Sequence, residues 1–122
     1  MARKILMVDD EPALVFATRL CLEGVGYEVA TACDGSEALE KVLEVRPDLI
    51  LLDVHMPVKN GWDVLETLKA DPDTRGIPVI MLTVAAEPED ITRAYHHHCT
   101  WYHTKPFDPR DLIATIDRVL QA

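Results

Sequence analysis

Cysteine is scarce in this chain, and its three copies, Cys21, Cys33 and Cys99, are widely spaced. An odd number of cysteines without a CxxC spacing argues against a disulfide framework and against a paired-cysteine motif. The pattern instead indicates reduced thiols, and we expect a cytoplasmic protein.

Positive charge is also in short supply. Twelve Lys and Arg stand against 21 Asp and Glu, which gives a formal net charge of -9 at pH 7. A nucleic acid backbone and an anionic membrane surface both attract basic proteins. We therefore expect no direct binding to nucleic acid and no membrane association.

Long hydrophobic segments are missing as well. Apolar runs such as residues 5–8 and 49–52 are far shorter than the roughly 20 residues that span a bilayer. The N-terminus leads straight into the first of these runs, so we expect no signal peptide. With 48% hydrophobic and 27% charged residues, the composition is typical of one globular domain, which we expect to cover residues 1–122.

The chain does contain a regular alternation of short apolar runs and segments with helical periodicity. The runs predict strands at residues 4–8, 27–32, 49–52, 79–82 and 101–103. Each run is followed by a segment with helical periodicity. These segments begin after Pro12, after Ser36 and after Gly61, extend over residues 87–98, and begin again after Pro109. Five strand–helix pairs predict an α/β fold, a doubly wound (βα)5 chain with a five-stranded parallel sheet.

Polar side chains follow four of the five predicted strands. Asp9 and Asp10 come after the first, Asp53 after the third, Thr83 after the fourth and Lys105 soon after the fifth. In a doubly wound sheet the carboxyl ends of the strands line the ligand crevice. Three carboxylates there require a cation, which Mg²⁺ or the Lys105 ammonium can supply. A carboxylate nucleophile, a divalent ion, a lysine and a hydroxyl are the parts of a phosphoryl-transfer site.

Each of these residues also has an ordinary structural interpretation. Aspartate and threonine at the end of a strand commonly cap the following helix, and a lone lysine is commonly a solvated surface charge. Their joint placement after four different strands favours a functional site.

Four short motifs, in order along essentially the whole chain, resemble the receiver domain of two-component response regulators. They are Val8-Asp9-Asp10-Glu11, Asp53-x-x-Met56-Pro57-x-x-Asn60-Gly61, Leu82-Thr83 and Lys105-Pro106-Phe107. The resemblance implies a flavodoxin-like receiver fold and a signalling protein rather than an enzyme with a diffusible product.

The same resemblance implies a role for each site residue. Asp53 would accept a phosphoryl group from a phosphohistidine on a sensor histidine kinase or phosphotransfer protein. Asp9, Asp10 and Asp53, with the backbone carbonyl of His55, would hold Mg²⁺. Lys105 would pair with the phosphoryl oxygens, and the Lys105–Pro106 peptide bond would be cis.

Two further residues match the switch positions of the family. Thr83 would swing its hydroxyl toward the phosphoryl group, and Tyr102 would rotate inward to fill the space that Thr83 leaves. The signal would then be read on a surface formed by the fourth helix, fifth strand and fifth helix. A downstream effector protein, an output domain or a second copy in a phosphorylation-dependent homodimer would bind there.

The sequence departs from the family pattern in two places. Val84 stands where a smaller residue is usual, and it either slows the entry of small phosphodonors or is a neutral loop residue. The segment His96-His97-His98-Cys99 replaces the usual Gly-Ala pair and its neighbours. Only His96 and Cys99 share a helical face, so a metal site, a pH-sensitive surface and a solvated helix end all remain open.

Two other function classes compete with a receiver. An aspartyl phosphatase or phosphotransferase would carry a second acid two residues after its nucleophile, where this chain has His55. A pseudo-receiver would bind proteins without phosphorylation, and the complete polar set at the strand ends argues against that alternative.

Overall fold

The computed structural model describes residues 2–56, 60–83 and 100–121. The strands are β1 (Lys4–Val8), β2 (Glu28–Ala32), β3 (Leu49–Asp53), β4 (Val79–Thr83) and β5 (Trp101–Thr104). The helices of the described residues are α1 (Pro12–Gly24), α2 (Gly35–Val45), α3 (Gly61–Ala70) and α5 (Pro109–Gln121). The strands form one parallel sheet in the order β2-β1-β3-β4-β5, which confirms the predicted doubly wound α/β fold.

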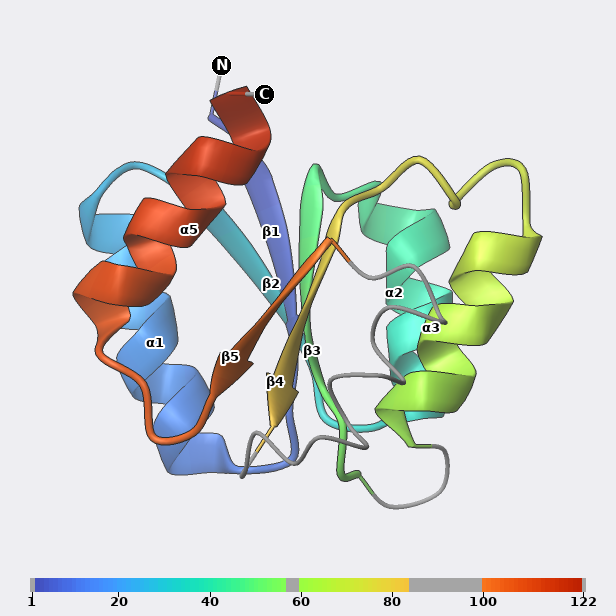
Figure 1. The fold of residues 1–122 in the computed structure, drawn as a ribbon, viewed down its shortest axis with the longest axis horizontal. Coiled ribbons are helices and arrows are strands. Elements are labelled where there is room, and N and C mark those ends of the chain that lie inside the picture. Colours follow the sequence, from blue (N-terminus) through green and yellow to red (C-terminus); the bar gives the residue numbers. More distant parts are fainter. Residues whose placement is uncertain (1, 57–59, 84–99, 122) are drawn as a thin grey trace.

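The sheet is covered on both faces. Helices α1 and α5 lie on one side of it, and α2 and α3 lie on the other (Figure 1). Leu65 and Val42 belong to the apolar cluster under α2 and α3, and Leu22 and Ile116 belong to the one under α1 and α5. Every residue of β3 and β4 is buried. Strands that are buried on both faces need continuous apolar sequence, which is why these two show no polar alternation.

Capping residues explain where α2 and α3 begin. Asp34 accepts a hydrogen bond from the N–H of Glu37 at 2.8 Å, and the Glu37 carboxylate reaches back to the N–H of Cys33. Asn60 accepts in the same way from the N–H of Asp63. These side chains satisfy N–H groups that a helix cannot pair internally, so both starts are encoded locally.

Four strand boundaries differ by one residue from the prediction: the start of β2 and the ends of β3, β4 and β5. Tyr27 precedes β2 because its N–H donates to the carbonyl of Leu22 and closes the end of α1. At the other edge, β5 continues to Thr104, which pairs with Thr83 of β4. Asp53 likewise extends β3 by pairing with Leu82 of β4. These shifts arise from backbone partners that lie outside the strand's own sequence.

The predicted fourth helix, Val84 and the His96-to-Cys99 segment lie outside the described residues. Within the part of the chain that the structure describes, no helix is both long enough and apolar enough to traverse a bilayer.

Candidate functional site

The polar residues predicted at the strand ends do meet at one edge of the sheet. Asp9 follows β1 and is held there by a hydrogen bond from its N–H to the carbonyl of Ala32. Asp53 is the last residue of β3, and the N–H of Lys105 donates to the carbonyl of Thr83 at 2.6 Å. The parallel register brings these three strand ends together, although they are far apart in the sequence.

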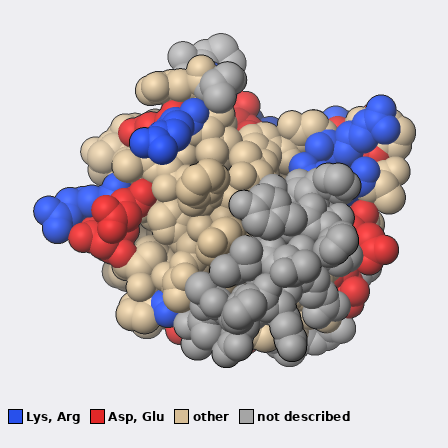
Figure 2. Space-filling model, viewed as in Figure 1, with Lys and Arg blue, Asp and Glu red and all other residues tan. Residues whose placement is uncertain are grey.

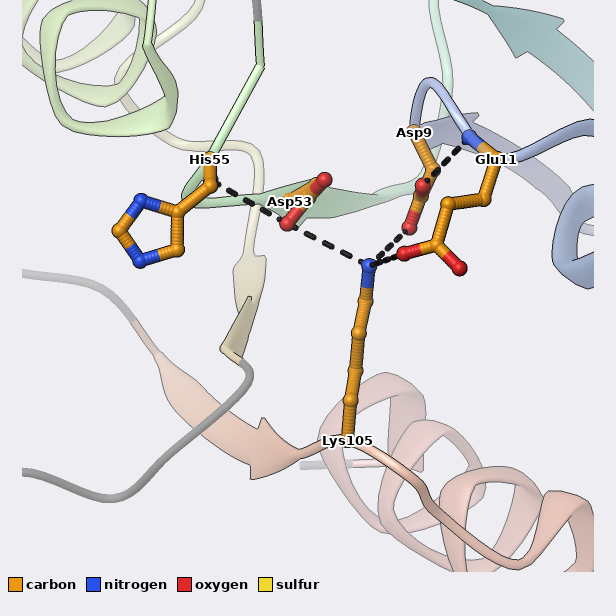
Figure 3. A network of polar contacts seen from close by, with 5 residues as sticks. All are labelled: Asp9, Glu11, Asp53, His55 and Lys105. Atoms are coloured by element: carbon orange, nitrogen blue, oxygen red, sulfur yellow. Dashed lines mark hydrogen bonds and ion pairs between the residues drawn. The ribbon is translucent and has the colours of Figure 1, made fainter.

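Lys105 is the centre of the arrangement. Its Nζ lies 2.7 Å from Asp9 Oδ2, 3.1 Å from Glu11 Oε1 and 3.4 Å from Asp53 Oδ1 (Figure 3). Asp9 and Asp53 are each 2% exposed and Lys105 is 9% exposed, so their charges are largely removed from water. Charges in such surroundings interact more strongly than on a surface, and they need partners.

Glu11 is the member of this network for which the sequence predicts no role. The sequence identifies it only as the fourth residue of the first motif. Its contact with Lys105 joins residues 94 positions apart, which no local pattern reveals. A signal is nonetheless present: glutamate stands at the position before Pro12, where short capping side chains are the usual choice.

A divalent cation fits the acidic part of the site. Carboxylate oxygens of Asp9, Asp10 and Asp53 lie within 4.8 Å of one another, with Asp10 exposed and the other two buried. In the described part of the chain, Asp9 Oδ2 is a buried side-chain oxygen without a hydrogen bond, and its compensation is the ion pair with Lys105. Three hard oxygen donors open to solvent on one side suit Mg²⁺, which retains several waters.

The pKa values show how the charges in the site are balanced. Burial and the neighbouring charge of Asp9 raise the pKa of Asp53 to about 6, although Lys105 acts in the opposite direction. Burial by itself would lower the pKa of Lys105, but the carboxylates of Asp9, Glu11 and Asp53 outweigh it and raise that pKa. The site therefore favours further positive charge beside Asp53.

Backbone geometry fixes the position of Asp53. The N–H of His55 donates to Asp53 Oδ1 at 3.2 Å, and the imidazole ring of His55 points away from Lys105 (Figure 3). On the other side, α3 begins so close to β3 that a Cβ on Gly61 would lie 2.2 Å from the Asp53 carbonyl oxygen. Only glycine permits this approach, which gives the Asn60-Gly61 motif a physical reason.

The two predicted switch residues lie near the same edge. Thr83 is 4% exposed at the end of β4. Tyr102 is half-buried on β5, packs against the cluster under α2 and α3, and pairs in register with Met81. The Lys105–Pro106 peptide bond is cis, as the resemblance implied. Any movement of Thr83 and Tyr102 remains a prediction.

Comparisons of the sequence and of the structure with known proteins lead to the same family. The model of the response regulator receiver domain matches residues 5–117. The DNA-binding response regulator MtrA of Mycolicibacterium smegmatis is 40% identical over 116 residues, which are 95% of this chain and 50% of MtrA. The phosphate regulon transcriptional regulatory protein PhoB of Klebsiella pneumoniae is 40% identical over 121 residues, 99% of this chain and 53% of PhoB.

Solved structures agree. The chemotaxis response regulator CheY4 of Vibrio cholerae superposes with a TM-score of 0.91 at 35% identity, covering 98% of this chain and 99% of CheY4. A CheY-like receiver domain protein from Methanospirillum hungatei gives 0.92 at 32% identity, covering 99% of this chain and 95% of that one.

The chain thus spans about half the length of the curated regulators MtrA and PhoB, and nearly all of the solved receiver structures. The match to the family covers β1 from its second residue, all of β2 to β5, and most of α5. The chain belongs to the response regulator receiver domain family.

Proposed function

We propose that residues 1–122 act as one receiver domain that takes a phosphoryl group onto Asp53 from a phosphohistidine of a sensor histidine kinase or phosphotransfer protein. Receiver domains in general switch on phosphorylation and bind Mg²⁺ at an acidic pocket. The observation that carries the proposal is the buried Asp53 carboxylate, with Lys105 Nζ 3.4 Å away and the carboxylates of Asp9 and Asp10 beside it.

The transfer step follows from this geometry. A carboxylate oxygen of Asp53 attacks phosphorus, and an O–P bond forms as the N–P bond to the imidazole breaks. The departing imidazole nitrogen keeps the electron pair and takes up a proton. Lys105 balances the charge that spreads over the phosphoryl oxygens, and its raised pKa keeps it an ammonium throughout.

Asp9, Asp10, Asp53 and the backbone carbonyl of His55 would hold Mg²⁺. When bound, the ion supplies positive charge to the phosphoryl oxygens. The carboxylates of this chain serve to bind and orient it, and the ammonium of Lys105 approaches from the side of β5. Burial of Asp9 and Asp53 excludes water from much of this surface.

Thr83 and Tyr102 would convert the new charge into a change of shape. Phosphorylation adds negative charge and acceptor oxygens next to the end of β4, where the Thr83 hydroxyl can donate to them. Tyr102 lies one strand away and would rotate into the space released. The surface that includes β5 and α5 would then bind an effector protein, an output domain or a second copy of the chain. No diffusible product forms, so the role is signalling rather than catalysis.

Among the residues that the structure describes, Figure 2 shows no concentrated basic patch on its side of the molecule. The described Lys and Arg side chains lie toward the edges of that view, next to acidic side chains, and surface without charged side chains separates them where it is described. With a net charge of -9, we propose that this domain does not itself contact nucleic acid and works in the cytoplasm. The DNA-binding function named for MtrA belongs to that protein, of which this chain matches half.

The test is intact mass spectrometry after incubation with Mg²⁺ and acetyl phosphate. We expect the mass of one phosphoryl group to be gained by the wild-type chain, and no gain with Asp53→Asn or without Mg²⁺. If acetyl phosphate gives no product, a phosphohistidine protein donor decides whether Val84 merely excludes the small donor. Failure with both donors would overturn the proposal in favour of a pseudo-receiver.

A further inference from the structure

The Glu11 side chain makes a contact that its place in the fold does not require. Glu11 is the N-cap residue of α1, yet its side chain makes no capping hydrogen bond. Its N–H donates instead to Asp9 Oδ1 at 3.0 Å, and its carboxylate is directed at Lys105 Nζ, 3.1 Å away (Figure 3). The start of the helix therefore does not explain the orientation of this carboxylate, whereas the ammonium of Lys105 does.

The three carboxylates around Lys105 differ sharply in exposure. The side chains of Asp9 and Asp53 are 0% and 3% exposed, whereas that of Glu11 is 59% exposed. Separating a buried carboxylate from its cation leaves an uncompensated charge in a poorly solvated place. The Glu11 carboxylate already contacts water, so it can release Lys105 at little cost.

The ammonium of Lys105 is shared among three carboxylates, and it donates a side-chain hydrogen bond to Glu11. A lysine ammonium carries three N–H donors, and three carboxylates surround this one. A phosphoryl group on Asp53 presents new oxygens with more negative charge than the carboxylate alone. A phosphoryl oxygen would compete with the carboxylates for the Lys105 ammonium, and the exposed Glu11 is the partner that can withdraw at the least cost.

We propose that Glu11 is a positioning residue: it holds the Lys105 ammonium in the unphosphorylated site and gives it up to the phosphoryl group, so that it weakens phosphoryl binding. The inference rests on the proposed function and adds a specific competitor to it. Glu11 contacts neither phosphorus nor the attacking oxygen and acts only through Lys105. Its removal therefore frees Lys105 and also takes one negative charge away from the incoming anion.

The experiment measures the binding of beryllofluoride, a phosphoryl mimic, in the presence of Mg²⁺. Glu11→Gln removes the charge, and Glu11→Asp keeps the charge but shortens the reach to Lys105. Glu23→Gln is the matched control, because it breaks an exposed ion pair with Arg19 at the other end of the same helix. We expect both Glu11 variants to bind about two- to fivefold more tightly than wild type, and the control to match wild type.

A second measurement reports the contact itself. In the Mg²⁺-free, unphosphorylated protein, the NMR signal of the Lys105 ammonium should shift and exchange faster with water in both Glu11 variants. Glu23→Gln, which also alters helix α1, should leave the Lys105 signal unchanged. A change seen in the Glu11 variants alone therefore reports the contact with Lys105 and not a general loss of helix stability. Unchanged or weaker beryllofluoride binding by Glu11→Gln would overturn the inference, as would a Glu11→Asp variant that behaves like wild type in both measurements.

The proposed function and the role of Glu11 fail on different results. If the wild-type chain does not bind beryllofluoride with Mg²⁺, the proposed function is overturned and the role of Glu11 with it. If the wild-type chain binds and Glu11→Gln binds equally well, the receiver chemistry stands and only the role of Glu11 is overturned.

Discussion

The two edges of the sheet differ in how their polar groups are arranged: one buries charged side chains together, and the other pairs its polar groups by ordinary hydrogen bonds. At the carboxyl edge, Asp9, Asp53 and Lys105 are buried, and Asp53 is ionised at neutral pH although its pKa is raised to about 6. At the amino edge, where the two termini lie close together, polar groups are paired in conventional ways (Figure 1). The backbone N–H of Lys4 donates to Asp48 Oδ2 at 2.8 Å, for example.

The amino edge also ties α5 to the rest of the chain. The hydroxyl of Tyr27 donates to Asp117 Oδ1, and Arg3 Nη2 donates to the carbonyl of Leu120. These contacts satisfy polar groups and cost little. The amino edge thus pairs its polar groups in the folded state, whereas the carboxyl edge holds the Asp53 carboxylate, whose ionisation costs folding free energy.

The largest effect is expected for the stability of Asp53→Asn in the absence of metal, which tests this contrast between the two edges. The wild-type pKa of Asp53 is about 6 in the folded state against an ordinary 3.8, so ionisation costs folding free energy. The folded state binds more protons than the unfolded state between these values, and stability therefore falls as pH rises from about 4 to 6. At pH 7 the variant should be more stable, by on the order of 3 kcal/mol at most.

Urea unfolding in EDTA measures this difference. Below about pH 4 the difference in stability between the variant and wild type should disappear, because Asp53 is then protonated in both the folded and the unfolded wild-type chain. Mg²⁺ should narrow it at pH 7 by stabilising the wild-type carboxylates. A metal-free variant that is less stable than wild type at pH 7 would show that the carboxyl edge is not a destabilising region.

Gly61→Ala tests how tightly that edge is packed. The new Cβ would meet the Asp53 carbonyl oxygen at 2.2 Å, so α3 or the end of β3 must move. We expect a loss of about 1–3 kcal/mol in stability and slower phosphorylation of Asp53. Gly24→Ala is the control, because open space surrounds that position, and it should be neutral or slightly stabilising. Equal behaviour of the two alanine variants would refute the close approach.

Tyr27→Phe probes the amino edge. It removes the hydrogen bond to Asp117, and we expect a loss of about 1–2 kcal/mol with no change in phosphorylation of Asp53. Burial first, and then the contact with Asp117, raise the pKa of Tyr27 to about 12. Wild-type stability should thus decline as pH rises from about 10 toward 12, and the variant should lack this decline. A phosphorylation defect in this variant would mean that the two edges are coupled.

The smallest effect is expected at His103, which pairs with Leu82 of β4 one residue before the carboxyl end of each strand. His103 Nε2 lies 2.8 Å from Thr115 Oγ1, and Thr115 Oγ1 lies 3.1 Å from the carbonyl oxygen of Asp111. Burial lowers the pKa of His103, which the charge of Asp111 only partly offsets.

As the pH falls, the imidazole of His103 is therefore protonated in the unfolded state before it is protonated in the folded state. The free energy of unfolding decreases for this reason as the pH falls below about 6.5. In thermal unfolding, the melting temperature should fall less between pH 7.5 and pH 5.5 for His103→Leu than for wild type. His55→Gln, which alters an exposed imidazole, should retain the wild-type difference. A pH response in His103→Leu equal to that of wild type would contradict this role of burial.

Much of the fold is determined by local sequence. The apolar runs of β3 and β4 predict buried parallel strands, and Asp34 and Asn60 mark the starts of two helices. Arg46 and Pro47 predict the end of α2, but not the left-handed conformation of Arg46, with φ of 55°. A conformation that costs a non-glycine residue energy is imposed by the surrounding chain, and residue propensity does not foretell it.

The same division applies to the site. Asp9, Asp53, Thr83 and Lys105 are expected together because parallel strands place their carboxyl ends at one edge. The tertiary structure alone decided that Lys105 would also contact Glu11, that Tyr27 would bind Asp117 90 residues away, and that β3 and α3 would approach so closely at Gly61. Periodicity determines which face an element buries, whereas the distance and angle between elements determine which side chains meet.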